Sequence, residues 1–159
     1  MTRSATPEDL LFFYNIYMHP SVNPFLLYEE LPLADFTPIY HDLLQKKSLF
    51  IFSEQGRDIG MFKLLPQMYR NAHIVYLGGL AIHPDHFGRG YSKMMMTEII
   101  DLARTRGFLR IELSVAATNQ RAIHLYESFG FQREGVLRNY TYLAKEAKYI
   151  DEVMMAKIN

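Results

Sequence analysis

Two segments in the first third of the chain show the apolar periodicity of helices, and each has a threonine–proline pair near its start. In the first segment, Thr6 and Pro7 precede two acidic residues, a composition typical of a helix N-terminus. In the second, Thr37 and Pro38 open a pattern that continues to about Lys47. We therefore predict two amphipathic helices, one starting at each pair.

The middle of the chain has the patterns of β-strands. Two apolar runs, 48–54 and 58–66, flank a turn at Gln55–Gly56, which predicts an antiparallel hairpin. The segment 71–84 is a longer apolar run and predicts a further strand. Gly78–Gly79 in the middle of that strand indicates a bulge or a close backbone approach.

Helical and strand patterns alternate in the second half. We predict helices at 89–106 and 119–131, each closed by a glycine, and strands at 108–115, 132–143 and 148–158. The resulting order, β-α-α-β-β-β-α-β-α-β-β, predicts an α/β fold with a mixed, twisted sheet and helices on both faces. Because no linker or repeat is visible, we expect one domain spanning all 159 residues.

The composition excludes several classes of function. Hydrophobic residues make up 49% of the chain and charged residues 21%, values typical of a globular protein. The 17 basic and 17 acidic residues balance, so we expect no nucleic-acid partner. The chain has no cysteine, and its six histidines form no helical His-x-x-x-His pair, so we expect no metal site. With no apolar run of about 18 residues and no signal-peptide pattern, we expect a cytoplasmic protein without membrane partners.

The stretch "AIHPDHFGRGYSKMMM" places Gly88 and Gly90 directly before a predicted helix, where backbone N–H groups commonly bind an anion. A P-loop is excluded, because Lys93 does not follow the glycine that the motif requires. A dinucleotide-binding turn would use Gly88, Arg89 and Gly90, with Glu112 at about the right distance to bind a ribose. Lys93 replaces the third glycine of that motif, which makes this alternative the weaker one.

The same stretch resembles the motif "V-x-P-x-x-[RQ]-G-x-G-x-[GA]" of the GCN5-related N-acetyltransferases, with Phe87 and Ser92 as departures. The downstream "IELSVAATNQRAIHLYESFGFQREGVLR" resembles the second signature of that family. The resemblance implies an N-acetyltransferase fold and acetyl-coenzyme A as cosubstrate. It assigns the pyrophosphate to a turn made of these residues: Phe87, Gly88, Arg89, Gly90, Tyr91 and Ser92.

The resemblance also implies roles along the neighbouring strand and the next helix. The backbone of Leu80, Ala81 and Ile82 would position the thioester, and an N–H near Leu80 or Ala81 would stabilise the oxyanion. Tyr126 would protonate the leaving thiolate, and Asn119 would contact the coenzyme. Each also has a purely structural interpretation: Leu80–Ile82 as a bulged core strand, Tyr126 as a core aromatic residue and Asn119 as a helix N-cap.

The resemblance implies direct acetyl transfer to a primary amine in a ternary complex. The absence of cysteine, which rules out an acetyl-cysteine intermediate, is consistent with direct attack. Candidates for the base are Glu112, His83 and Tyr76, and water is an alternative proton acceptor. Glu112 has an alternative interpretation as an ion-paired strand residue.

The acidic, aromatic loop at 21–36 is either a site for a cationic amine or an ordinary solvated loop. The C-terminal segment resembles enzymes that acetylate free amino acids, polyamines or the N-termini of ribosomal proteins. The sequence leaves homodimerisation open. The competing hypothesis is an acyl-coenzyme A-binding module of the same fold without activity.

Overall fold

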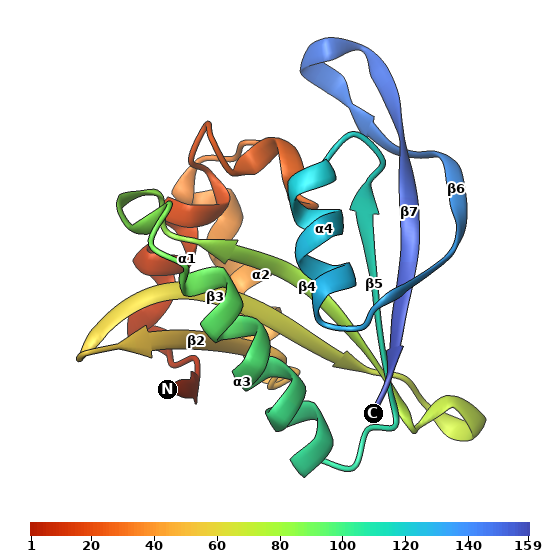
Figure 1. Cartoon of the computed structure of the whole chain (residues 1–159). Helices are drawn as coiled ribbons and strands as arrows, with labels where there is room; N and C mark the ends of the chain where they lie inside the picture. Colours follow the sequence, from red (N-terminus) through yellow and green to blue (C-terminus); the bar gives the residue numbers. More distant parts are fainter. The chain divides into compact units, whose positions relative to one another are not determined.

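The computed structural model describes residues 1–159 and confirms the predicted order of helices and strands (Figure 1). The helices are α1 Leu10–Tyr17, α2 Leu33–Gln45, α3 Tyr91–Thr105 and α4 Gln120–Ser128. The strands are β1 Thr2–Ser4, β2 Leu49–Glu54, β3 Arg57–Pro66, β4 Ile74–Ile82, β5 Arg110–Ala116, β6 Gln132–Leu143 and β7 Lys148–Ile158.

The sheet has seven strands in the order β1-β2-β3-β4-β5-β7-β6. β4 and β5 are parallel, whereas β1 with β2, β2 with β3, β5 with β7, and β6 with β7 are antiparallel. The mixed sheet is therefore confirmed. No helix is both long and apolar enough to span a bilayer.

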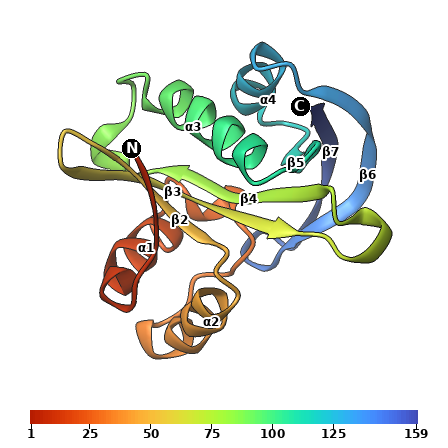
Figure 2. The same ribbon diagram turned by 90° about the horizontal axis from the view of Figure 1, so that it is seen from below.

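The chain forms two compact units whose boundaries fall within β3, β4 and α3. The first comprises Met1–Leu64 and Gly79–Glu98, and the second comprises Leu65–Gly78 and Ile99–Asn159. In the first unit, α1 and α2 cover one face of β2 and β3, and the start of α3 lies on the other face (Figure 2). Apolar side chains alternate accordingly along β2, so that Leu49 and Ile51 belong to the core beneath α1 and α2.

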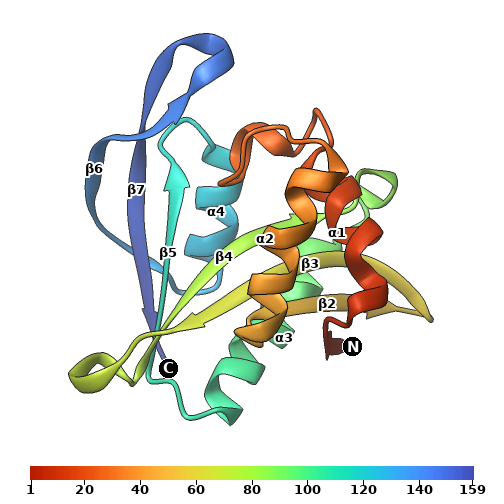
Figure 3. The ribbon, with the colours of Figure 1, turned by 180° about the vertical axis from the view of Figure 1, so that it is seen from behind.

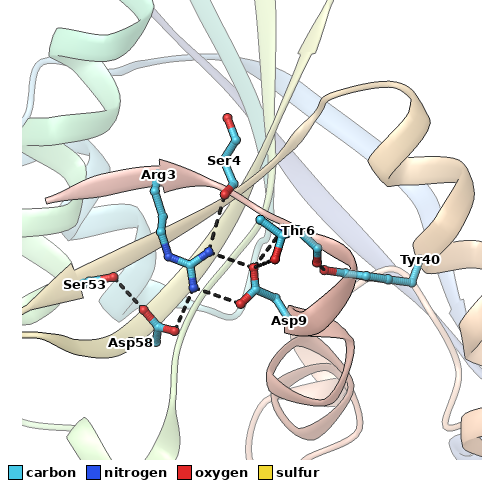
Figure 4. Close-up of polar contacts among 7 residues, drawn as sticks. All are labelled: Arg3, Ser4, Thr6, Asp9, Tyr40, Ser53 and Asp58. Carbon is cyan, nitrogen blue, oxygen red and sulfur yellow. Dashed lines mark hydrogen bonds and ion pairs between the residues drawn. The ribbon is translucent and has the colours of Figure 1, made fainter.

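A polar network fixes the N-terminus of the first unit (Figure 4). The Arg3 guanidinium donates to both carboxylate oxygens of Asp9, at 2.7 and 2.8 Å, and to Asp58 at 2.9 Å. Asp9 in turn accepts the Thr6 backbone N–H at 2.8 Å. The Tyr40 hydroxyl donates to the Thr6 carbonyl at 2.6 Å and so connects α2 to this network. Thr6 and Pro7 therefore start the first helical segment as predicted, through a 3₁₀ turn that precedes α1.

The predicted start of α2 is wrong by about one turn. The helix begins at Leu33 rather than at Thr37–Pro38, and Pro38 lies inside it. Proline lacks an N–H, so Pro38 donates no helical hydrogen bond to the carbonyl four residues earlier. The N–H groups of Asp35 and Phe36 donate to the Pro32 carbonyl, at 3.0 and 3.1 Å, and this anchors the earlier start.

The second unit combines the first half of β4 with β5, β6, β7 and α4. Figure 3 shows α4 alongside β5, with β7 and β6 on the other side of that strand. β5 alternates buried and partly exposed residues, and its buried Ile111, Leu113 and Val115 contribute to the core. Ile123 and Tyr126 are the buried residues of α4, which ends before Gly130 at a φ of +86°.

Candidate active site

The glycine turn between β4 and α3 presents free backbone N–H groups. Gly88 and Gly90 have φ values of +75° and +79°, a conformation that glycine adopts without steric cost. The N–H groups of Gly88, Arg89 and Gly90 make no backbone hydrogen bond. Those of Tyr91 and Ser92 begin α3, where the first N–H groups have no partner within the helix. All these donors precede or open a 15-residue helix, whose dipole favours an anion at this end.

Phe87 is the one residue of the predicted turn that offers no N–H to a ligand. Its N–H donates to the Pro84 carbonyl at 3.1 Å and closes the short 3₁₀ turn Pro84–His86. Its side chain is about half exposed. A Cβ at Gly88 or Gly90 would meet no atom within 4 Å, so the space over the turn is open. The N–H groups of the turn that are available to a ligand are therefore those from Gly88 onward.

Two histidines support the turn, and one of them was not among the predicted site residues. His83, a candidate base, accepts the Asp85 N–H at its Nδ1 atom at 3.3 Å, so it caps the 3₁₀ turn. His86 packs edge-on against Tyr91, and its Nδ1 is buried without a hydrogen-bond partner. Burial, followed by the positive charge of Arg89, lowers the pKa of His86. The only sequence signal for His86 was its position directly before Phe87, the first residue of the predicted turn.

The strand segment that was assigned to the thioester lies in the first unit with the turn. β3 approaches it so closely that a Cβ at Gly60 would lie 2.7 Å from the Ala81 carbonyl oxygen. The side chain of Ala81 is buried in the core beneath α1 and α2. Gly79, directly before this segment, has a φ of +56°, and a Cβ there would lie 2.6 Å from the Tyr17 hydroxyl. The glycine pair is therefore approached closely at Gly79, but by side chains and not by the backbone that the sequence predicts.

The other predicted catalytic residues belong to the second unit. The parallel register of β4 and β5 ends at the pair Tyr76–Glu112, although β5 continues to Ala116. The Tyr76 hydroxyl and Ser114 Oγ lie 2.9 Å apart just beyond that end. Tyr76 is thus engaged with a serine hydroxyl at the point where the strands stop pairing.

Tyr126 on α4 is buried, and its ring centroid lies 5.9 Å from that of Phe131. Burial, together with the neighbouring Tyr76, raises the pKa of Tyr126 to about 12. The phenol therefore stays protonated throughout the physiological range. It can donate a hydrogen bond, and its packing is also that of a core aromatic residue.

Asn119 and Glu112 both have structural partners. Asn119 is the N-cap of α4, and its Oδ1 accepts the Ala122 N–H at 3.2 Å, as the structural interpretation predicts. Glu112 accepts from Arg110 Nε at 2.7 Å, and Arg110 also pairs with Glu134. Glu112 is consequently held in an ion-paired network on the sheet.

The aromatic residues of the loop 21–36 do not all face solvent. Phe36 is fully buried, and Tyr28 packs against it with ring centroids 6.3 Å apart. The Lys63 ammonium lies 5.1 Å from the centre of the Tyr28 ring, so one face of this ring already contacts a cation. The aromatic part of the loop therefore belongs to the core, and only its outer residues, such as Phe25, are exposed.

Comparisons with known proteins give results consistent with this arrangement. The 64 residues aligned with a ribosomal protein bS18-alanine N-acetyltransferase of Salmonella typhimurium are 42% identical and span 40% of this chain and 43% of that relative. A spermidine N(1)-acetyltransferase of Vibrio cholerae is 26% identical over 85% of this chain and 80% of its own length.

Among solved structures, a Vibrio cholerae spermidine N-acetyltransferase in complex with CoA and spermine superposes with a TM-score of 0.86. It is 23% identical and covers 99% of this chain and 94% of its own, and it shows the shared fold. The sequence profile of the Acetyltransferase (GNAT) family matches residues 10–131, which is most of the chain. The chain, with its glycine turn and element order, therefore belongs to the acetyltransferase (GNAT) family.

Proposed function

We propose that this protein transfers an acetyl group from acetyl-coenzyme A to a primary amine by direct attack. The observation that carries the proposal is the turn with positive φ at Gly88 and Gly90, whose free N–H groups open α3. An anion bound there neutralises the positive end of the helix dipole. The solved relative that holds coenzyme A, and the relatives named as N-acetyltransferases, support this choice of ligand.

In this proposal the coenzyme lies along residues of the first unit. The N–H groups of Gly88 through Ser92 bind the pyrophosphate, and the exposed Arg89 adds positive charge. The backbone of Leu80, Ala81 and Ile82 positions the thioester, and an N–H of this segment donates to its carbonyl oxygen. Because these are backbone groups, the apolar character of the three side chains does not weaken the assignment.

In the chemical step, the amine nitrogen attacks the carbonyl carbon, the C–N bond forms, and the C–S bond breaks. We propose that Tyr126 donates its hydroxyl proton to the departing sulfur, and that Asn119 contacts the coenzyme beside it. With the pKa of Tyr126 at about 12 and that of a thiol at about 8.5, complete transfer to a free thiolate costs about 5 kcal/mol. Tyr126 therefore acts mainly as a hydrogen-bond donor, and the proton follows as the sulfur leaves.

The amine must lose a proton during the reaction. The carboxylate of Glu112 is a side-chain candidate for accepting this proton, but protonation would break its ion pair with Arg110, whose Nε lies 2.7 Å away. We therefore propose that water is the first proton acceptor, and that Glu112 takes part only after exchange of this ion pair. Glu112→Gln distinguishes the two routes: a loss of more than about 100-fold in kcat would favour the carboxylate.

Release of coenzyme A from acetyl-coenzyme A, with and without a panel of amines, tests the proposal. The panel would contain free amino acids, polyamines and peptides with free N-termini, and mass spectrometry would identify the product. A thiol reagent is suitable because the chain contains no cysteine. We expect stimulation by at least one amine, with one acetylated amine formed for each coenzyme A released. Tight binding of acetyl-coenzyme A without any acetylated amine would instead favour a binding module.

A further inference from the structure

One face of the sheet in the second unit carries polar side chains that are only partly buried. The register pairs Tyr76 of β4 with Glu112 of β5, and it pairs Ala116 at the end of β5 with Glu152 of β7. Because alternate residues of a strand point to the same side, Tyr76, Ser114 and Glu152 share this face. All three are partly exposed, so solvent reaches them.

The carboxylate of Glu152 has a neutral partner. Thr141 Oγ1 donates to its Oε1 atom at 2.7 Å. Glu112, on the same face, is instead paired with Arg110, whose Nε lies 2.7 Å away. Protonation of Glu112 breaks an ion pair, whereas a protonated Glu152 keeps its hydrogen bond, because a threonine hydroxyl also accepts. Glu152 can therefore take up a proton without losing an ion pair.

Tyr76 relates Glu152 to Tyr126, the proposed proton donor. The Tyr76 hydroxyl lies 2.9 Å from Ser114 Oγ, and either oxygen can be the donor. Ser114 and Glu152 are diagonal neighbours across β5 and β7, a spacing that long side chains can bridge. Burial raises the pKa of Tyr76 against the effect of the hydrogen bond with Ser114, and the negative charge of Glu152 raises it further. After burial, Tyr76 is the next contribution to the raised pKa of Tyr126.

An open hollow beside Glu152 leaves room for a substrate. The register of β6 with β7 shifts between Leu137 and Thr141, and Leu137 is the residue that pairs with Glu152. The hollow at this bulge has a volume of about 670 Å³ and is lined by Val136, Leu137, Arg138, Asn139, Tyr140 and Asp151. Tyr140 also contributes to the raised pKa of Tyr76, so the hollow adjoins the polar face.

We propose that Glu152 receives the proton of the acceptor amine through water. An alkylammonium ion loses two protons on becoming an amide. The first passes through water to the Glu152 carboxylate and then to solvent, and the neutral amine attacks the thioester carbon. The second leaves the nitrogen after attack and balances the proton that ends on the sulfur of coenzyme A. This inference rests on the proposed function, because it names the destination of the proton that the proposed function assigns to water.

The test is the pH dependence of kcat/KM for Glu152→Gln, measured with the best acceptor of the amine panel. At pH 7 we expect a loss of at least tenfold, because the variant depends on amine that is already neutral. The loss should narrow at least threefold between pH 7 and pH 9, since the neutral fraction of an amine with a pKa of about 8 or above rises about tenfold or more. The other ionisable side chains near Glu152 on the surrounding strands are Tyr76, Arg110, Glu112, Arg138 and Tyr140, and the substitution keeps all of them.

Glu146→Gln is the matched control, because Glu146 is an exposed carboxylate that is paired with Lys148 on the same hairpin. Its kcat/KM should equal that of the wild type at both pH values. The Kd of Glu152→Gln for acetyl-coenzyme A should change less than threefold by calorimetry, which shows that the variant folds and binds the coenzyme.

Unchanged turnover in Glu152→Gln, or a loss that is the same at pH 7 and pH 9, would overturn the inference while the proposed function stands. So would a larger change in the Kd for acetyl-coenzyme A, because Glu152 would then act through the fold or the coenzyme site. A wild type that acetylates no amine would instead overturn the proposed function, and the inference with it.

Discussion

Replacing Gly79 by alanine is expected to destabilise the protein strongly, because two separate costs arise at this position. The backbone has a φ of +56°, where an L-residue with a Cβ loses about 1–2 kcal/mol relative to its preferred conformation. The new Cβ would also lie 2.6 Å from the Tyr17 hydroxyl, well inside van der Waals contact. Tyr17 cannot swing away easily, because it is packed between Tyr28 and Phe36 with ring centroids 5.3 and 5.4 Å away.

The two costs can be separated by choice of variants. Overpacking of a core adds about 1–3 kcal/mol, so we expect Gly79→Ala to lower the free energy of unfolding by about 2–5 kcal/mol. Gly56→Ala is the matched control, because Gly56 has a φ of +74° but no atom within 4 Å of its would-be Cβ. It should lose only the backbone cost of about 1–2 kcal/mol. Combining Gly79→Ala with Tyr17→Phe removes the clashing oxygen and should recover at least about 1 kcal/mol.

Urea unfolding followed by circular dichroism measures these differences for the wild type, the two glycine variants, Tyr17→Phe and the double variant. Tyr17→Phe alone should be neutral or slightly stabilising, since its hydroxyl has no hydrogen-bond partner to lose. If Gly79→Ala costs no more than Gly56→Ala, or if Tyr17→Phe gives no recovery, the close packing of α1 against β4 would be refuted.

Four further predictions concern the site and its pH dependence. Tyr126→Phe should reduce kcat at least tenfold and change the Kd for acetyl-coenzyme A less than threefold by calorimetry; unchanged turnover would remove the phenol from the mechanism. The raised pKa of Tyr126, about 12, means that the folded state keeps its proton above pH 10 while the unfolded chain loses it. The stability of the wild type relative to Tyr126→Phe should therefore fall by about 2 kcal/mol between pH 9 and pH 12, and a constant difference in urea unfolding would contradict this. The hydrogen bond from Arg3 lowers the pKa of Asp9, so its contribution is present above the unfolded value of about 3.9 and is lost as the pH falls. The advantage of the wild type over Arg3→Met, about 1 kcal/mol at pH 7, should shrink towards pH 3 in the same unfolding assay, and a pH-independent advantage would refute it. Gly90→Val should raise the Kd for acetyl-coenzyme A at least tenfold, because a β-branched residue is strained at a φ of +79°; equal affinity would exclude the turn as the binding site.

Local signals made the element order predictable from the sequence. Each predicted helix or strand had its own cap, turn or alternation of apolar and polar residues. Examples are the turn at Gln55–Gly56 and the N-cap Asn119, and the mixed sheet follows from the order of these elements. The start of α2 was missed because Pro38 is typical of a first helical position and Pro32 also precedes the helix. The hydrogen bond from the Phe87 N–H to the Pro84 carbonyl was also missed, because a 3₁₀ turn leaves little pattern in a sequence.

Contacts between distant segments were not predictable in the same way. The pairing of Glu112 with Arg110 was one of two interpretations that the sequence left open, and only the geometry of β5 favours it. Likewise, Lys63 of β3 and Tyr17 of α1 are far apart in the sequence and both lie against Gly79. The one trace of this contact in the sequence is a single lysine within the apolar run 59–66.

Thermal unfolding in the presence of acetyl-coenzyme A, coenzyme A, NAD and ATP tests the central claim most directly. A ligand at about 100 times its Kd adds about 2.7 kcal/mol of stability, or about 5–10 °C for a chain of this size. We predict such a shift with both forms of coenzyme A, and its loss in Gly90→Val. A shift with NAD or ATP alone would contradict the assignment of the glycine turn to acetyl-coenzyme A.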